Sequence, residues 1–274
     1  MSLINGNINE SIDILDRGFQ YGDGVFETIE VLNGKPLFLD RHLSRLEKGC
    51  KNLLIPAPDV VKLTDEALQL SADVSHAVLK LIVTRGTGGR GYRQPSPITP
   101  TRVLTLFPFP DFPEYFSTQG ISTRFCHHRL ASNPPLAKIK HLNRLDQIIA
   151  RAEWQDESIQ EGIMLDYQGQ VIEGTMSNLF MVKDSVIYTP ILSDCGVAGI
   201  VREIIIEIIK QQMLQFYEQK IGIATLLTAD EIFVTNSIIG IWPVKQLQEF
   251  EYGIGAMTRN LQEKYQAIRL DRKK

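Results

Sequence analysis

The nine residues Leu106-Phe-Pro-Phe-Pro-Asp-Phe-Pro-Glu114 divide the chain into two halves. Three closely spaced prolines exclude a helix interior and a central strand, because proline has no amide hydrogen and a fixed φ. At ~150 residues per domain, a chain of 274 residues is long enough for two domains. We therefore predict an N-terminal α/β domain over residues 1–106, a linker over residues 107–114, and a C-terminal mixed-sheet domain over residues 115–274.

Before the linker, strand-like patterning occurs in three stretches, Val25 to Leu32, Val78 to Thr84 and Arg102 to Phe107. A helix is expected between the first two strands, with Asp40 as its N-cap and Pro56 closing it. Its apolar residues recur at helical spacing as Leu43, Leu46, Cys50 and Leu53.

After the linker, strands outnumber helices. The expected strands are Ile121 to Phe125, Gly162 to Asp166, Gln170 to Glu173, Leu179 to Val182, Val186 to Thr189 and Glu231 to Thr235. The expected helices are Leu142 to Trp154 and Val201 to Leu214. Short turns, one of them with Gly169, join two strand pairs as hairpins. This pattern predicts an α+β or mixed α/β fold, not an alternating doubly wound sheet.

Composition excludes several classes of function. The formal net charge is −3, which provides no electrostatic basis for binding nucleic acid or an anionic membrane. Cys50, Cys126 and Cys195 are too scattered to indicate a disulfide framework or a metal site. The N-terminus has no signal-peptide pattern, and no apolar stretch reaches the ~18 residues of a membrane span. We therefore expect a cytoplasmic protein.

The stretch Gly86-Thr-Gly-Gly-Arg-Gly91 has the G-x-G-x-x-G spacing of dinucleotide sites. Those sites need a helix that opens at the last glycine, and here Pro95 and Pro97 oppose one. We therefore interpret it as a loop. Its arginines at positions 85, 90 and 93 suit a carboxylate or a phosphate, and a solvated basic loop fits their composition equally well.

Two residues are candidates for the chemistry of a bound cofactor. Lys140, expected at the start of a helix beside Ile139, is a candidate nucleophile because burial would disfavour its charged form. A surface lysine is the alternative, and Lys138 competes for the role. Glu173 ends an apolar strand and could hold the protonated nitrogen of a pyridine ring, although a strand-end glutamate facing water has the same sequence pattern.

Two further features suit a phosphate group. The stretch Gly196-Val-Ala-Gly-Ile-Val-Arg202 places glycines at a helix start, where free amides and the helix dipole favour anions. Arg41 and Arg45 are four residues apart on the helix expected after Asp40 in the N-terminal domain, and they share one face of it. An ordinary helix entry and a solvated helix face are the respective alternatives.

Together these segments resemble the fold type IV pyridoxal-phosphate enzymes, also called D-amino acid aminotransferase-like. The matching segments occur in the same order as in that family and cover nearly the whole chain. They are Leu3–Gly6, Asp16–Gly24, Arg41–Leu46, Arg85–Tyr92, Ile139–Leu145, Glu173 with Ser177–Phe180, and Gly199–Arg202. The stretches GGRGY and KHLNR are most similar to the branch of lyases that acts on 4-amino-4-deoxychorismate.

The resemblance implies a role for each matched residue. Lys140 would form the Schiff base with pyridoxal 5'-phosphate, and Glu173 would pair with the pyridine nitrogen. The phosphate would be bound by Arg45, by the amides of Ile200 and Val201, and by Ser237. Arg90 and Tyr92 would bind substrate carboxylates, and Thr28 would lie near the reacting atoms. The family also implies a homodimer.

The implied reaction converts 4-amino-4-deoxychorismate to 4-aminobenzoate and pyruvate, a step towards folate. A branched-chain or D-amino acid aminotransferase is the nearer alternative, and Glu27 beside Thr28 is typical of that activity. The branched-chain enzymes have a tyrosine five residues after the lysine, where this chain has Leu145, which argues against the branched-chain enzymes but not against the D-amino acid enzymes. A non-catalytic protein that binds a phosphate ligand is the more distant alternative.

Overall fold

The computed structural model describes residues 1–270, and it contains two compact units. One unit comprises Met1–Asp111 and Ile139–Asn143, and the other comprises Phe112–Lys138 and the chain from Arg144 onward. The chain therefore passes from the first unit to the second inside the proline-rich segment. Lys140 was expected in the C-terminal domain, but it belongs to the first unit, because the amide of Phe26 donates a 2.9 Å hydrogen bond to the carbonyl of Lys140.

The first unit is built on a six-stranded sheet in the order β2-β1-β6-β5-β3-β4. Its strands are β1 (Ser2–Ile4), β2 (Asn7–Ile8), β3 (Gly24–Leu32), β4 (Lys35–Pro36), β5 (His76–Thr84) and β6 (Thr101–Pro108). The three predicted strands of this half are confirmed as β3, β5 and β6. Pro108 nevertheless extends β6 into the expected linker, because it occupies the terminal position of the strand, opposite Ala77.

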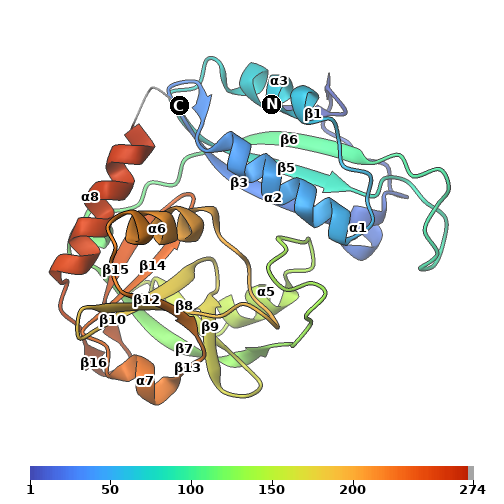
Figure 1. Cartoon of the computed structure of the whole chain (residues 1–274). Coiled ribbons are helices and arrows are strands. Elements are labelled where there is room, and N and C mark those ends of the chain that lie inside the picture. The colour runs from blue at the N-terminus through green and yellow to red at the C-terminus, as the bar shows by residue number, and fades with distance from the viewer. Residues whose placement is uncertain (271–274) are drawn as a thin grey trace. The chain divides into compact units, whose positions relative to one another are not determined.

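Three helices belong to the first unit, namely α1 (Arg17–Tyr21), α2 (Leu39–Asn52) and α3 (Val60–Ser71). Figure 1 shows α2 and α3 against the sheet. The predicted apolar face of α2 is confirmed, since Leu43, Leu46 and Cys50 are buried in the core. The predicted N-cap is wrong, because Phe38 occupies that position and Asp40 lies inside the first turn. An acidic residue is still favourable there, next to the positive end of the helix dipole.

The second unit is built on a mixed sheet whose main path is β12-β11-β10-β14-β15-β7-β8-β9-β13, with β16 beside β15. Its strands are β7 (Ile121–Leu130), β8 (Glu161–Asp166), β9 (Gln170–Gly174), β10 (Asn178–Lys183), β11 (Val186–Pro190), β12 (Phe216–Gln219), β13 (Ile221–Gly222), β14 (Glu231–Asn236), β15 (Gly240–Leu247) and β16 (Phe250–Glu251). The predicted hairpins are confirmed as the antiparallel pairs β8–β9 and β10–β11. β7 pairs in parallel with both β8 and β15, so the predicted mixed α+β class is confirmed.

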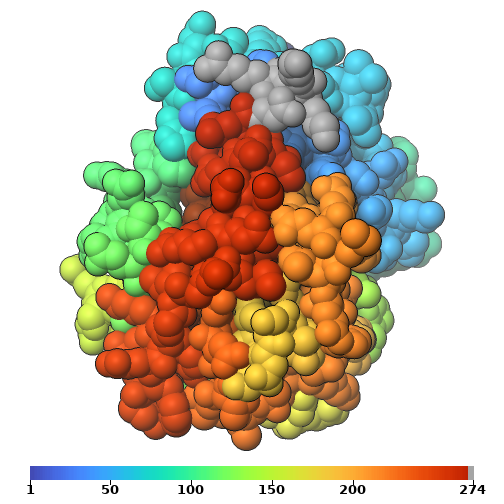
Figure 2. Space-filling view, turned by 60° about the vertical axis from the view of Figure 1, so that its left-hand side comes forward, coloured from blue at the N-terminus to red at the C-terminus, as the bar shows by residue number. Residues whose placement is uncertain are grey.

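The helices of this unit are α4 (Tyr115–Thr118), α5 (Leu145–Arg151), α6 (Ile200–Gln211), α7 (Ile223–Leu227) and α8 (Ala256–Leu270). In Figure 2, α8, in red, lies beside orange residues of α6, and the side chain of Asn260 donates to that of Gln212 at 2.8 Å. Neither α3 nor α8 was predicted. None of the helices within residues 1–270 combines the length and the apolar character needed to cross a bilayer.

The helix expected over Leu142 to Trp154 is shorter than predicted, because α5 begins only at Leu145. The preceding residues run alongside β3, and the amide of Leu142 donates to the carbonyl of Gly24 at 3.0 Å. Backbone groups bound to a strand cannot also make helical hydrogen bonds. Lys140 therefore lies in an extended segment and does not start a helix.

Candidate functional site

Burial distinguishes Lys140 from its competitor Lys138. Ile139 is buried and Lys140 is half-buried, whereas Lys138 is exposed and has a φ of 70°. The Nζ atom of Lys140 lies 4.4 Å from the centroid of the Phe26 ring, which is within the range of a cation–π contact. The backbone of Lys140 is held to β3, so the structure gives this lysine a fixed, partly apolar environment.

Thr28 lies on the same strand as Phe26, two residues further along. Side chains two residues apart on a strand point to the same face of the sheet, so Thr28 shares the face that carries Phe26. Its register partner on β5 is Lys80, whose Nζ lies 5.5 Å from the Phe26 ring. Thr28, Phe26 and Lys140 are thus all part of the first unit.

Glu173 lies on β9 of the second unit and is only 4% exposed. Its Oε2 atom accepts a hydrogen bond of 2.8 Å from the amide of Val197, and Asn178 lies 3.4 Å from the same oxygen. The side chain of Gln147 approaches Oε1 at 3.4 Å. The alternative of a strand-end glutamate facing water is therefore excluded, and the carboxylate is held by donors on two sides.

The start of α6 has the form of an anion site. Its N-cap is Gly199, and no side chain caps the first turn, which contains Ile200 and Val201. The amide of Gly199 donates to Oδ1 of Asn178 at 3.0 Å, and a Cβ on this glycine would lie 2.1 Å from that oxygen. Glycine is therefore required for the backbone to approach Asn178. The amides of the first helical turn have no acceptor within the helix, and such amides are the groups that bind a phosphate.

Ser237, the other expected phosphate contact in this unit, is half-buried in the turn that follows β14. Two residues earlier, the Oγ1 atom of Thr235 is buried and has no hydrogen-bond partner among the described residues. A buried hydroxyl without a partner is costly. A polar ligand at this end of β14 could bind the hydroxyl groups of both Thr235 and Ser237.

Arg45 is part of a buried ionic cluster in the first unit. Its Nε atom donates to Oε1 of Glu27 at 2.8 Å, and its Nη2 atom contacts Oε2. Nδ1 of His42 lies 2.6 Å from the same Oε2 atom. Arg41, one turn earlier on α2, is half-buried. A guanidinium has five N–H donors, so Arg45 can bind Glu27 and a phosphate together.

The electrostatics of this cluster follow from its burial. Desolvation opposes ionisation of Glu27, but the charge of Arg45 and the hydrogen bonds from Arg45 and His42 outweigh it and hold the pKa of Glu27 at about 2. Desolvation lowers the pKa of His42 from 6.5, although Glu27 acts in the opposite direction. Glu27 is thus ionised and His42 neutral at pH 7, which makes Nδ1 of His42 a donor to the carboxylate.

Arg90 and Tyr92 lie on the loop between β5 and β6, where residues 85–100 have bends and irregular backbone and one isolated bridge at Thr87. Tyr92 is 88% exposed, and Arg90 is exposed as well. The loop interpretation of the glycine-rich stretch is confirmed, because no helix follows Gly91 in this described segment. Both side chains are accessible to a ligand, and both belong to the same unit as Lys140.

Several residues that support these candidates carry no recognisable motif in the sequence. Glu27 is predicted only as a neighbour of Thr28, and the sequence predicts no separate role for His42, Asn178 or Asp23. One signal was present: Glu27 alternates with Val25 and Ile29, which are core residues of β3. An acidic residue at a core position of a strand indicates a buried ion pair.

Known proteins resemble this chain over nearly its whole length. Residues 24–247 match the family described as amino-transferase class IV. An aminodeoxychorismate lyase from Vibrio harveyi is 34% identical over 266 residues, which cover 96% of this chain and 98% of the relative. The crystal structure of 4-amino-4-deoxychorismate lyase from Pseudomonas aeruginosa has a TM-score of 0.94 and 43% identity, covering 97% of this chain and 98% of that one.

A more distant solved structure shares the fold. It is the T.th. branched-chain amino acid aminotransferase complexed with N-(5'-phosphopyridoxyl)-L-glutamate. Its TM-score is 0.84 at 23% identity, and the match covers 97% of this chain and 93% of that chain.

Proposed function

Because the chain belongs to the class IV aminotransferase family, we propose that it is a pyridoxal-phosphate-dependent lyase that converts 4-amino-4-deoxychorismate to 4-aminobenzoate and pyruvate for folate synthesis. The observation that carries this proposal is the similarity to the Pseudomonas aeruginosa lyase, at 43% identity over 97% of the chain. The Vibrio harveyi relative supports it independently.

The residues present fit pyridoxal 5'-phosphate. Lys140 would hold its aldehyde carbon, and Glu173 would keep its ring nitrogen protonated. The uncapped first turn of α6 at Ile200 and Val201, together with Ser237, provides donors of the kind that a phosphate group binds, and Arg45 adds a positive charge. When bound, the cofactor supplies an electron sink that stabilises negative charge on the amine-bearing carbon.

Lys140 would move the proton in this reaction. Its Nζ, as a neutral amine, would remove the proton from the carbon that carries the substrate amine. The bond between the ring carbon and the enolpyruvyl oxygen then breaks, its electron pair leaves with that oxygen, and the ring becomes aromatic. The protonated Nζ would return the proton to the methylene carbon of the departing enol, which gives pyruvate. Thr28, on the sheet face of Phe26, would line the site of this transfer.

Arg90 and Tyr92 would bind the substrate. 4-Amino-4-deoxychorismate has two carboxylates, one on the ring and one on the enolpyruvyl group. Two carboxylates need more than one cationic or donor group, and the exposed loop offers a guanidinium and a phenol two residues apart. The need to bind two carboxylates distinguishes the lyase from an aminotransferase that acts on an amino acid with a single carboxylate.

An aminotransferase is the second candidate, and Glu27 is the feature that favours it. The decisive measurement is release of 4-aminobenzoate from 4-amino-4-deoxychorismate by the purified protein loaded with pyridoxal phosphate, with no keto acid added. We expect turnover under these conditions. The proposal is wrong if this substrate is inert while a D- or branched-chain amino acid is converted in the presence of 2-oxoglutarate. A weak transaminase side reaction alone would not contradict the lyase.

The proposed enzyme is a cytoplasmic homodimer. Leu145, Ile148 and Ile149 on α5 are each at least half exposed, and a contiguous apolar helix face of this kind suits a partner subunit. The three cysteines are free thiols, as is usual in the reducing cytoplasm. Size-exclusion chromatography with light scattering measures the molar mass and so tests the dimer. The mass of a monomer at micromolar concentration would contradict it.

A further inference from the structure

Gly91 lies between the two substrate-binding candidates, Arg90 and Tyr92, and both of its backbone polar groups, N–H and C=O, are bound by side chains of α1. Nη1 of Arg17 donates to the carbonyl of Gly91 at 2.9 Å. The amide of Gly91 donates to the hydroxyl of Tyr21 at 3.1 Å. The guanidinium of Arg17 also lies over the Tyr21 ring, 4.8 Å from its centroid. The two side chains therefore form a single clamp on one residue of an otherwise exposed loop.

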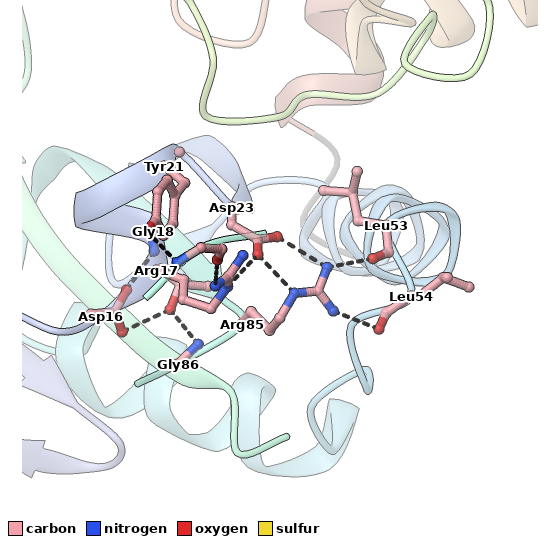
Figure 3. Close-up of polar contacts among 12 residues, drawn as sticks. Asp16, Arg17, Gly18, Tyr21, Asp23, Leu53, Leu54, Arg85 and Gly86 are labelled. Atoms are coloured by element: carbon pink, nitrogen blue, oxygen red, sulfur yellow. Dashed lines mark hydrogen bonds and ion pairs between the residues drawn. The ribbon is translucent and has the colours of Figure 1, made fainter. Parts of the chain in front are cut away.

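Arg17 is itself held rigidly, although it serves a surface loop. It is only 3% exposed, and its Nε donates to Oδ2 of Asp23 at 2.9 Å. The same oxygen accepts from Nε of Arg85 at 2.7 Å, so Asp23 bridges the two guanidinium groups (Figure 3). Arg85 in turn donates to the carbonyls of Leu53 and Leu54 at 2.6 and 2.8 Å. The clamp is thus connected to the end of α2.

The base of the loop also packs on Arg17. The amide of Arg17 donates to the carbonyl of Gly86 at 2.9 Å, and the amide of Gly88 donates to the carbonyl of Leu15 at 3.2 Å. A Cβ added to Gly88 would lie 2.8 Å from Cδ of Arg17, so the absence of a side chain lets the loop approach the arginine stem. Gly88 therefore allows the close contact between the loop and α1.

The segment that follows the clamp leads to Lys140. Asp23 directly precedes β3, where Gly24 accepts from the amide of Leu142 at 3.0 Å and Phe26 donates to the carbonyl of Lys140 at 2.9 Å. One short stretch of chain, from Arg17 to Phe26, thereby binds the loop at one end and the lysine segment at the other.

We infer that Arg17 and Tyr21 are positioning residues for substrate recognition. By clamping Gly91 they hold the Arg90 and Tyr92 backbone in place for a substrate carboxylate, so that the carboxylate does not have to order the loop when it binds. This inference rests on the proposed lyase function. Tyr92 packs edge-on against Tyr21, with ring centroids 5.9 Å apart, which adds an apolar contact to the same clamp.

The sharpest test is Tyr21→Phe, which removes the acceptor for the Gly91 amide and keeps the ring. We expect KM for 4-amino-4-deoxychorismate to rise about two- to tenfold, as for one lost hydrogen bond, with kcat nearly unchanged. Hydrogen exchange of the Gly91 amide should become faster, and the visible spectrum of the bound cofactor should stay the same. Arg17→Met removes a charge-assisted bond and should raise KM further, roughly ten- to hundredfold.

The control is Tyr217→Phe, which removes a hydroxyl bound to Gln215 at the surface of the second unit and should change neither KM nor Gly91 exchange. A Tyr21→Phe variant with wild-type KM contradicts the inference while leaving the lyase function standing, even if Gly91 exchanges faster. A fall in kcat at constant KM contradicts it too. A wild-type protein inert towards the substrate contradicts the proposed function, and this inference with it.

Discussion

The guanidinium of Arg45 is bound to the carboxylate of Glu27, with Nε 2.8 Å from Oε1. The carboxylate is 1% exposed and the arginine side chain 13%, so water screens this pair only weakly. His42 completes the cluster through Oε2 of Glu27. The residue expected to bind a phosphate is therefore already fixed by a buried acid, and this has consequences for stability and for cofactor binding.

Glu27 should make the protein sensitive to acid. Its pKa is about 2 in the folded protein and 4.5 as a free side chain, so its ionised form stabilises the fold above pH 4.5. That stability is lost as the pH falls through 4.5 towards 2, and it is on the order of 3 kcal/mol. In urea unfolding of the cofactor-free protein, Glu27→Gln should be less stable than wild type at pH 7, with a shallower decline in acid. Parallel pH profiles would contradict this assignment.

Arg45→Gln should weaken cofactor binding. The variant loses a charge-assisted phosphate contact, which typically corresponds to a ten- to hundredfold increase in Kd. Fluorescence titration of the cofactor-free protein with pyridoxal phosphate measures this Kd. Arg102→Gln is the matched control, because Arg102 forms a partly buried ion pair with Glu66 in the same unit. It should reduce stability and leave Kd unchanged, and equal effects of the two variants would refute the phosphate role.

Lys140 should carry the cofactor. We expect the purified protein to absorb visible light, to change its spectrum on borohydride reduction, and to yield the label on the peptide containing Lys140. Lys140→Ala should lose that chromophore and all turnover, yet still bind pyridoxal phosphate weakly through its phosphate. Lys138→Ala, which changes an exposed lysine two residues away, should behave like wild type. A label on Lys138 would show that the assignment is wrong.

Glu173→Gln should retain the cofactor but turn over roughly a hundredfold more slowly, because a neutral partner no longer stabilises a protonated ring nitrogen. Single-turnover kinetics at saturating substrate would measure this. Glu161→Gln provides a control in the same unit, since Glu161 is equally buried and accepts a 2.7 Å hydrogen bond from Ser177. It should affect stability more than turnover. Near-normal turnover of Glu173→Gln would remove this residue from the proposed site.

Arg90→Ala should act on substrate affinity and not on the cofactor. Loss of a guanidinium–carboxylate contact is expected to raise KM roughly ten- to hundredfold. The cofactor spectrum should be unaltered, because Arg90 is an exposed residue of the loop between β5 and β6. Steady-state kinetics together with the absorption spectrum test both parts. An unchanged KM would assign the substrate carboxylates to other residues.

Local patterns in the sequence were sufficient to predict many elements. Alternating apolar residues predicted β3, β5 and β6, and the turn around Gly169, which has a φ of 78°, predicted the β8–β9 hairpin. Ordered short motifs along the chain identified the family, which the match over residues 24–247 confirms. These features depend on residues close together in the chain, where periodicity and turn chemistry act directly.

Contacts between distant parts of the chain decided what the sequence left open. Lys140 lies in an extended segment because its backbone pairs with β3, although the local pattern favours a helix there. Lys138 is exposed while Lys140 is half-buried, a distinction invisible in their shared sequence neighbourhood. The partners of Arg45 and Gly91 come from β3 and α1. Buried charges and buried backbone groups must find partners wherever the fold supplies them, so only the tertiary structure could identify these pairs.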